Sequence, residues 1–208
     1  MSPATQAISL DGATGRIEAL LDAPAQGETL GTAVLAHPHP LFGGTMHNKV
    51  VQTLARAFVS KGWRVVRFNF RGVGASEGTH DEGRGEAQDM LKVIAQVAPQ
   101  GALALAGFSF GAFVVTHVVQ ALGEHRLPLQ LVLVGTAASR FEVAQVPHAL
   151  HAHCLVVHGE QDDTVPLSSV MDWARPQSLP ITVIPGASHF FHGQLPLLKS
   201  LVTRHLTV

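Results

Sequence analysis

The chain has 208 residues, of which 46% are hydrophobic, and a mean hydropathy of +0.23, which predicts one globular domain over residues 1–208 with a sizeable core. Its 14 basic and 15 acidic residues are scattered without runs and leave a formal net charge of −1. We therefore expect neither a nucleic acid nor an anionic membrane as a partner, because both need a concentrated basic surface.

The first residues, MSPATQAISLDG, contain no basic segment followed by an apolar one, so no secretory signal is expected. No uncharged apolar stretch reaches the roughly 20 residues that span a bilayer. The single cysteine, Cys154, cannot form an internal disulfide, which fits a reducing compartment. These observations favour a cytoplasmic location, and the apolar run that contains Cys154 favours packing over a nucleophilic role for its thiol.

Runs of apolar, β-branched residues alternate with helical patterns along nearly the whole chain. Strands are predicted over residues 8–10, 16–21, 32–36, 64–70, 103–106, 129–134, 155–157 and 181–184. Helices are predicted over residues 47–60, 85–97, 110–122, 167–174 and 195–205. This alternation predicts an α/β fold with a mostly parallel central sheet of about eight strands and helices on both faces. The first two strands flank Asp11-Gly12 and are expected to form a hairpin at the sheet edge.

The segment Gly107–Gly111 (Gly-Phe-Ser-Phe-Gly) matches G-x-S-x-G, in which a strained strand-to-helix turn raises a serine above the sheet. A second match, Gly74–Gly78, lies in a polar stretch that is typical of a loop. A nucleophilic serine in such a turn needs a strand immediately before it and a helix immediately after it, and Ser109 has both. The sequence therefore predicts Ser109 as a nucleophile and Ser76 as a turn residue.

A serine nucleophile needs a histidine base and an acid that orients the histidine. In this architecture the acid follows a late strand and the histidine follows the last one. The loop after the strand at 155–157 offers Asp162 and Asp163, of which we favour Asp162 as the acid and Asp163 as a cap of the next helix. The loop after the last strand offers His189 and His192, of which His189 is the better base because it is nearer the strand end.

Acyl transfer also needs about two backbone amides that stabilise the oxyanion. The amide of Phe110, directly after the nucleophile, is expected to supply the first. The second is expected from the loop His37–Gly44, where the two prolines have no N–H and the amides of His39, Leu41 and Phe42 remain. Of these three we rank Leu41 first.

Several segments together resemble the α/β-hydrolase superfamily: His37–Met46, Arg67–Ser76, Gly107–Gly111, His158–Asp162 and Gly186–His189. The resemblance covers most of the chain, and the first of these segments and the small size are similar to a compact bacterial subgroup without a lid, described as candidate carboxylesterases. It implies a Ser-Asp-His esterase that needs no cofactor and no metal. It also assigns the acid to the first aspartate of His-Gly-x-x-Asp, which is Asp162.

About 18 residues separate the strand at 129–134 from Cys154, where larger relatives insert a helical cap, so no cap domain is expected. An open site favours small or short-acyl esters as substrates. Phe42 and Phe190 are the candidate substrate-binding residues, although phenylalanines at such positions also serve in ordinary packing.

Three other interpretations remain open. The same triad serves thioesterases, amidases and peptidases, because all share acyl-enzyme chemistry. A non-catalytic binding protein can keep the same fold. A metal site could use His148, His151 and His153, or His37 and His39, although no carboxylate or cysteine stands nearby at ligand spacing. The oligomeric state is not predicted.

Overall fold

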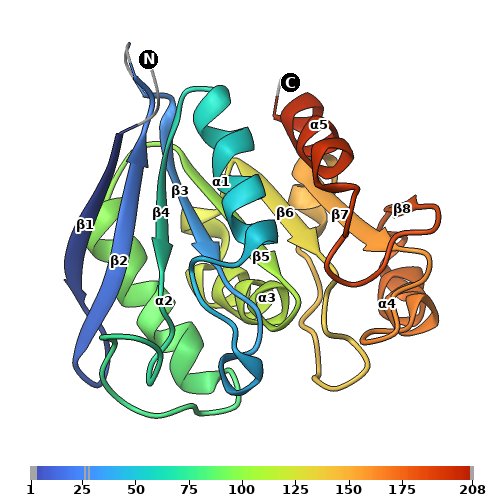
Figure 1. The fold of residues 1–208 in the computed structure, drawn as a ribbon, viewed down its shortest axis with the longest axis horizontal. Coiled ribbons are helices and arrows are strands. Elements are labelled where there is room, and N and C mark those ends of the chain that lie inside the picture. Colours follow the sequence, from blue (N-terminus) through green and yellow to red (C-terminus); the bar gives the residue numbers. More distant parts are fainter. Residues whose placement is uncertain (1–3, 26, 28, 207–208) are drawn as a thin grey trace.

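The computed structural model describes residues 4–25, 27 and 29–206, so the ends of the predicted domain, residues 1–3 and 207–208, lie outside the described residues. Within the described part, eight strands form one sheet in the spatial order β1-β2-β4-β3-β5-β6-β7-β8 (Figure 1). The strands are β1 (Ala4–Asp11), β2 (Arg16–Ala23), β3 (Gly31–Ala36), β4 (Trp63–Phe68), β5 (Leu103–Phe108), β6 (Gln130–Val134), β7 (Cys154–Gly159) and β8 (Ile181–Ile184).

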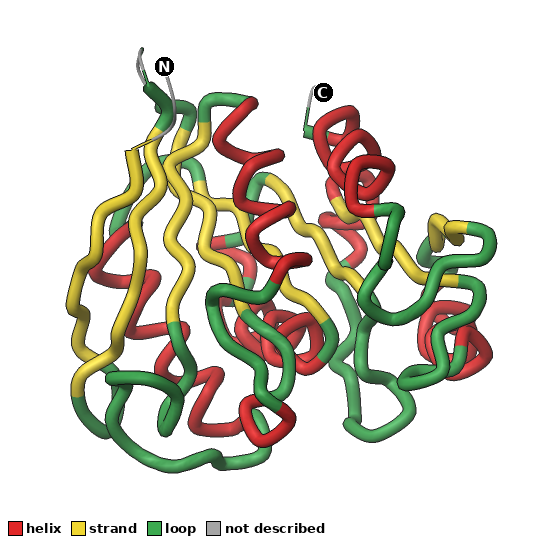
Figure 2. Tube along the Cα trace, viewed as in Figure 1, coloured by secondary structure: helices red, strands yellow, loops and turns green. Residues whose placement is uncertain are grey.

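The sheet is antiparallel at one edge and parallel elsewhere. β1 pairs with β2, and β2 with β4, in antiparallel register, whereas the neighbours from β4 across to β8 are all parallel. The carboxyl ends of the parallel strands therefore lie at one edge, where the loops at the bottom of Figure 2 gather. The predicted α/β class, the mostly parallel sheet and the hairpin of the first two strands are confirmed.

Helices cover both faces of the sheet. They are α1 (Lys49–Ser60), α2 (Arg84–Val97), α3 (Phe110–Leu122), α4 (Leu167–Ala174) and α5 (Leu195–His205), with short 3-10 helices η1 (Pro40–Phe42), η2 (Glu124–Arg126), η3 (His148–His153) and η4 (Arg175–Gln177). One core cluster joins the sheet to α1 and α5, through Phe58 and Leu198 for example. The other joins it to α2, α3 and α4, through Met90, Val115 and Val170. Because both faces are covered, every residue of β5 is buried.

One strand boundary differs from the prediction in an informative way, and one segment between strands agrees with it. The strand expected over 64–70 ends at Phe68, and the Asn69 side chain then accepts the Met46 amide and donates to Glu18, at 2.9 and 2.8 Å. Between β6 and β7, all of residues 135–153 are described and η3 is the one regular element among them, so the expected absence of a cap agrees with this segment.

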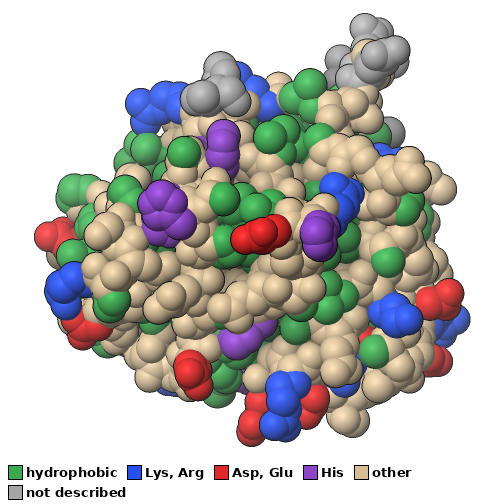
Figure 3. All heavy atoms as spheres, turned by 180° about the vertical axis from the view of Figure 1, so that it is seen from behind, with side chains coloured by type: hydrophobic (Ala, Val, Ile, Leu, Met, Phe, Trp, Pro, Cys, Tyr) green, Lys and Arg blue, Asp and Glu red, His purple; other side chains and the backbone are tan. Residues whose placement is uncertain are grey.

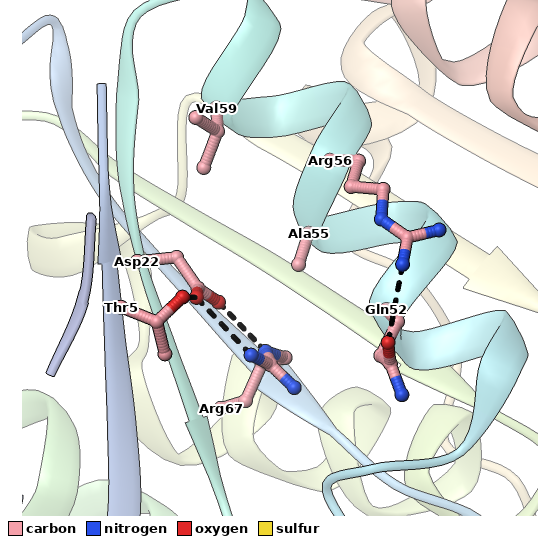
Figure 4. A pocket seen from close by; sticks show the side chains of 7 residues that line it. All are labelled: Thr5, Asp22, Gln52, Ala55, Arg56, Val59 and Arg67. Atoms are coloured by element: carbon pink, nitrogen blue, oxygen red, sulfur yellow. Dashed lines mark hydrogen bonds and ion pairs between the residues drawn. The ribbon is translucent and has the colours of Figure 1, made fainter. Parts of the chain in front are cut away.

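A cavity of about 220 Å³ lies between β2, β4 and α1, away from the predicted catalytic residues (Figure 4). Inside it, the Arg67 guanidinium donates two hydrogen bonds to the Asp22 carboxylate, with Nε–Oδ2 and Nη2–Oδ1 distances of 2.7 and 3.1 Å. The Thr5 hydroxyl donates to the same carboxylate at 2.6 Å, and Arg67 Nη1 donates to the Met46 carbonyl at 3.0 Å. The pair therefore fastens β2 to β4 and to the turn before α1, which is a structural role.

The surface of the described residues carries mixed charge on the face seen from behind, where Lys and Arg side chains lie among Asp and Glu side chains (Figure 3). Among the described helices, none is both long enough and apolar enough to cross a membrane.

Candidate active site

Ser109 stands alone between the end of β5 and the start of α3, with φ 57° and ψ −117°. A residue with a side chain rarely adopts a positive φ, and such strain is typical of functional turns. The turn is held by hydrogen bonds at both sides of the serine. Its amide donates to the Val134 carbonyl at 2.8 Å, and its own carbonyl accepts the Ala112 amide at 3.0 Å.

The glycines of the motif allow close backbone approach. A Cβ at Gly107 would collide with the Gly111 carbonyl, and a Cβ at Gly111 would collide with the carbonyls of Ala36 and His37 at the end of β3. The second G-x-S-x-G match has a different role. Ser76 donates its hydroxyl to the Asn69 carbonyl at 2.7 Å, as expected for a turn residue.

Three loops bring the predicted catalytic residues together. His189, which follows β8, places Nε2 3.0 Å from the Ser109 Oγ and Nδ1 2.7 Å from the Asp162 Oδ2. All three residues are buried, with exposed fractions of 7% for Ser109, 7% for Asp162 and 2% for His189. The structure thus joins the three side chains into one continuous hydrogen-bonded chain.

The Asp162 carboxylate is fully engaged. Its Oδ1 accepts the backbone amides of Thr164 and Val165 at 3.0 and 2.7 Å, which leaves Oδ2 for His189. Burial by itself raises the pKa of Asp162, but the hydrogen bonds from His189 and the Val165 amide outweigh burial and hold this pKa below its ordinary value. The carboxylate is therefore charged at neutral pH and presents one fixed oxygen to the imidazole.

The two rival side chains stand apart from this arrangement. His192 is exposed, and its ring lies 6.0 Å from the Phe190 ring. Asp163 is exposed too and accepts the Thr164 hydroxyl at 3.4 Å. The expectation that Asp163 caps the next helix is wrong, because Pro166 occupies the N-cap of α4 and no side chain bonds there.

The amides expected at the oxyanion site differ in availability. Phe110 is the first residue of α3, so no carbonyl within the helix accepts a hydrogen bond from its amide. The Leu41 amide donates to the His39 Nδ1 at 3.2 Å, and the Phe42 amide donates to the His39 carbonyl at 3.2 Å. The choice of Leu41 therefore conflicts with the hydrogen bonding inside its own loop. Among the described atoms, the amide of His39 has no partner, and its ring lies 4.8 Å from the Phe110 ring.

Ser109 opens into a cavity of about 320 Å³. Its lining comes from the loop before α1 and from the loops after β5, β6, β7 and β8, and consists of Pro38, His39, Phe42, Gly43, Gly44, Asn48, Ser109, Arg140, Thr164, His189 and Phe190. Phe42 and Phe190, the candidate substrate-binding residues, both line this cavity, whereas Leu41 is 69% exposed and faces the adjoining groove. A narrower crevice of about 40 Å³ also touches Ser109 and is lined by apolar groups that include Phe110, Ala137 and Val165.

Some residues that position the Ser109–Asp162–His189 side chains are not predicted from the sequence. Gly135 follows β6 with φ 55°, and a Cβ there would lie 3.2 Å from Phe108 and 3.3 Å from the His189 ring. A glycine directly after a buried strand was the available signal. The amides of Thr164 and Val165 form an Asx-type turn on Asp162, for which the order Asp-Asp-Thr was a weaker signal.

His37 ties the loop before η1 to the sheet. It is fully buried at the end of β3, with Nδ1 2.6 Å from the Pro38 carbonyl, and its Nε2 accepts the Phe70 amide at 2.9 Å. Because an amide can only donate, Nε2 has no proton and the ring is neutral. Burial lowers the pKa of His37 to about 4, although the bond to Pro38 acts in the opposite direction.

This neutral ring makes stability depend on pH. Between the ordinary value of 6.5 and the folded value of about 4, the unfolded chain binds a proton at His37 that the folded chain does not. The free energy of unfolding therefore decreases as pH falls through this range, by on the order of 2 kcal/mol from this residue between about pH 7 and pH 4.5. In urea unfolding, His37→Gln is expected to lose that part of the pH dependence, while the exposed His125→Gln keeps it. Equal pH dependence in all three proteins would contradict this account.

The candidate metal ligands and the single cysteine lie outside this arrangement. Among the described residues, no group of three or more His, Cys, Asp or Glu side chains could hold a metal ion. Burial raises the pKa of the Cys154 thiol to about 12, and this side chain packs against the core cluster of α2, α3 and α4. A thiol with such a pKa is a poor nucleophile at neutral pH.

Known proteins resemble this chain in sequence and in fold. Residues 11–141 match the family model described as X-Pro dipeptidyl-peptidase (S15 family), a range that contains Ser109 and ends before Asp162 and His189. A Rickettsia prowazekii relative described as uncharacterized protein RP471 is 32% identical over 96% of this chain and 87% of its own length.

Two solved structures are similar over nearly the whole length. XC6422 from Xanthomonas campestris, described as an α/β serine hydrolase without lid, is 36% identical, with a TM-score of 0.86 over 99% of this chain and 94% of that one. An α/β serine hydrolase homologue from Coxiella burnetii is 38% identical, with a TM-score of 0.81 over 97% of each chain. The chain therefore belongs to the S15 family within the α/β-hydrolase superfamily, and it is a serine hydrolase of the bacterial group without a lid.

Proposed function

We propose that this serine hydrolase is a carboxylesterase that cleaves small or short-acyl esters through an acyl-enzyme intermediate. The observation that carries the proposal is the position of His189, whose two ring nitrogens lie 3.0 Å from the Ser109 Oγ and 2.7 Å from the Asp162 Oδ2. An ionised carboxylate can only accept, so Nδ1 carries the proton and Nε2 is free to accept one. The imidazole is thus in the tautomer that a general base requires.

The proposed cycle moves one proton back and forth. Ser109 Oγ attacks the ester carbonyl while His189 Nε2 takes the hydroxyl proton, and Asp162 stabilises the imidazolium that results. The tetrahedral intermediate collapses, the C–O bond to the alcohol breaks, and His189 gives its proton to the departing alcohol oxygen. Water then attacks the acyl-enzyme with His189 again as base, and the carboxylic acid leaves.

The oxyanion of both tetrahedral intermediates needs donors, and we assign the amides of Phe110 and His39 to this role. The Phe110 amide lies at the N-terminus of α3, where the helix dipole adds to its effect. His39 takes the place expected for Leu41, because its amide has no partner in the described residues whereas the Leu41 amide has one. Each such donor contributes roughly 3–4 kcal/mol to transition-state stabilisation.

The lining of the site favours an ester over an X-Pro dipeptide. A dipeptidyl peptidase must hold the free α-ammonium group of its substrate, for which a carboxylate is the natural partner. The described lining of the Ser109 cavity contains no Asp or Glu, and its charged side chain is Arg140. The crevice of about 40 Å³ beside Ser109 has room for a short acyl group.

The test combines labelling with turnover. A fluorophosphonate should label Ser109, identified by mass spectrometry of the peptide, and p-nitrophenyl acetate and butyrate should be cleaved with higher kcat/KM than the octanoate and laurate esters. An X-Pro p-nitroanilide and an acyl thioester, measured in parallel, should react more slowly. Labelling at another residue, faster cleavage of the X-Pro substrate, or rates that rise steadily with chain length would each contradict the proposal.

A further inference from the structure

Arg140 is a cation at the mouth of the site for which the described structure supplies no counter-ion. It lies in the segment after β6 and lines both the Ser109 cavity and the apolar crevice beside it. Neither an ion pair within 4.0 Å nor a side-chain hydrogen bond is formed by its guanidinium within the described part of the chain. By contrast, Arg67 and Arg71 each pair with an aspartate at 2.7 Å.

The surroundings of Arg140 hold it toward the substrate space. Its guanidinium carbon lies 5.8 Å from the centroid of the Phe42 ring, which is another wall of the cavity. The next residue, Phe141, anchors the backbone, because its ring stacks on Phe113 at 4.7 Å and meets Phe110 edge-on at 5.2 Å. The guanidinium itself is exposed, so it can exchange water for a ligand at low cost.

The charges nearby point to an anionic ligand. No carboxylate lines the described part of the Ser109 cavity, whereas Glu82 and Glu142 face the adjoining groove, more than 4.0 Å from the Arg140 guanidinium. Burial lowers the pKa of His39; the neighbouring His80 and, to a smaller extent, Arg140 lower it further, whereas Glu86 raises it. A guanidinium presents a planar fork of donors that matches a carboxylate.

We propose that Arg140 makes this enzyme selective for esters that carry a free carboxylate near the scissile bond. The inference rests on the proposed esterase function and names its substrate class. The carboxylate can belong to the acyl side, as in a hemiester of a short dicarboxylic acid, or to the alcohol side. In either case it lies between Arg140 and Ser109, with the ester carbonyl at the nucleophile.

The turnover test compares an anionic with a neutral ester of similar length. The wild type is expected to prefer p-nitrophenyl hemiglutarate over p-nitrophenyl butyrate, and Arg140→Gln should lower the ratio of their kcat/KM values by about tenfold, mainly through KM. Arg140→Lys should recover part of the ratio, because it keeps the charge without the fork. Arg175→Gln removes an equal charge at an exposed ion pair of η4, and its ratio should equal that of the wild type. Added salt should weaken the preference.

A second pair of substrates locates the carboxylate. Dependence on Arg140 of 4-acetoxybenzoate alone, relative to phenyl acetate, assigns the anion to the alcohol side, and dependence of the hemiglutarate alone assigns it to the acyl side. Dependence of both shows that Arg140 accepts a carboxylate on either side. Equal ratios in the wild type and Arg140→Gln for both pairs would overturn the inference.

A binding measurement separates this inference from the proposed function. In the Ser109→Ala background, calorimetry should show that p-nitrophenyl hemiglutarate binds about tenfold more weakly when Arg140→Gln is added. If the wild type cleaved none of the esters, the esterase proposal would be overturned, while this binding difference would still stand. Equal binding by the two proteins of both the hemiglutarate and 4-acetoxybenzoate would overturn the role of Arg140 even if neutral esters are cleaved.

Discussion

Ser109→Ala is expected to lower kcat/KM for p-nitrophenyl butyrate by about 10⁴- to 10⁶-fold. The reason is that the variant keeps the cavity, the free amides and the His189–Asp162 pair but has no oxygen to form the acyl-enzyme. What activity remains would come from water activated by His189 and from oxyanion stabilisation. Labelling by fluorophosphonate should disappear completely, which can be read by mass spectrometry on the same samples.

The control is a serine outside the site. Ser168 is exposed in α4, and Ser168→Ala should keep wild-type turnover and wild-type labelling. Circular dichroism and thermal unfolding of Ser109→Ala should match the wild type, because alanine keeps the backbone strain at φ 57° and only the hydroxyl oxygen is removed. Retention of more than about one-hundredth of the activity would remove Ser109 from the role of nucleophile.

Asp162→Asn is expected to lower kcat by about 10³- to 10⁴-fold with little change in KM. The backbone amides of Thr164 and Val165 can only donate, so they require the side-chain oxygen of the asparagine at the Oδ1 position. The NH₂ group must then face His189 Nδ1, which becomes an acceptor. The ring proton moves to Nε2, and the imidazole can no longer accept the proton of Ser109.

Asp163→Asn is the matched control, since it makes the same chemical change one residue later at an exposed side chain. Its rate should remain within about twofold of the wild type. The pKa of Asp162 is held below its ordinary value, so its carboxylate is ionised at neutral pH, where the two variants should be compared. Equal losses in the two variants would show that the loop, and not the carboxylate of Asp162, is what matters.

Much of this architecture could be predicted from local patterns. The spacing of apolar runs marks strands and helices because burial between two helical layers demands continuous hydrophobic strands, as β5 shows with every residue buried. The turn at Ser109 could be recognised from the Gly107–Gly111 motif. The backbone passes so close to both glycines that neither position has room for a Cβ. Asp162 and His189 could be chosen because parallel strands deliver their carboxyl ends to one edge of the sheet.

The sequence could not decide between neighbouring groups within one loop. Ranking Leu41 first among the donors conflicts with the hydrogen bond from its amide to the His39 ring, and no pattern in the sequence shows which of several amides remains free. Likewise, Asp163 was expected to cap α4, whereas Pro166 occupies that position. Loop conformation is set by contacts with distant residues, such as the bond between His37 and the Phe70 amide.

By itself, therefore, the sequence determined the fold class, the order of the elements and the side chains that form the Ser109–Asp162–His189 chain, because each of these follows from short-range pattern and strand direction. The tertiary structure alone decided which backbone amides stay unpaired, how Asp162 divides its two oxygens, and that Arg140 reaches the Ser109 cavity without a counter-ion. These properties depend on which groups from separate segments meet, because donors, acceptors and charged groups find their partners only when the segments pack together.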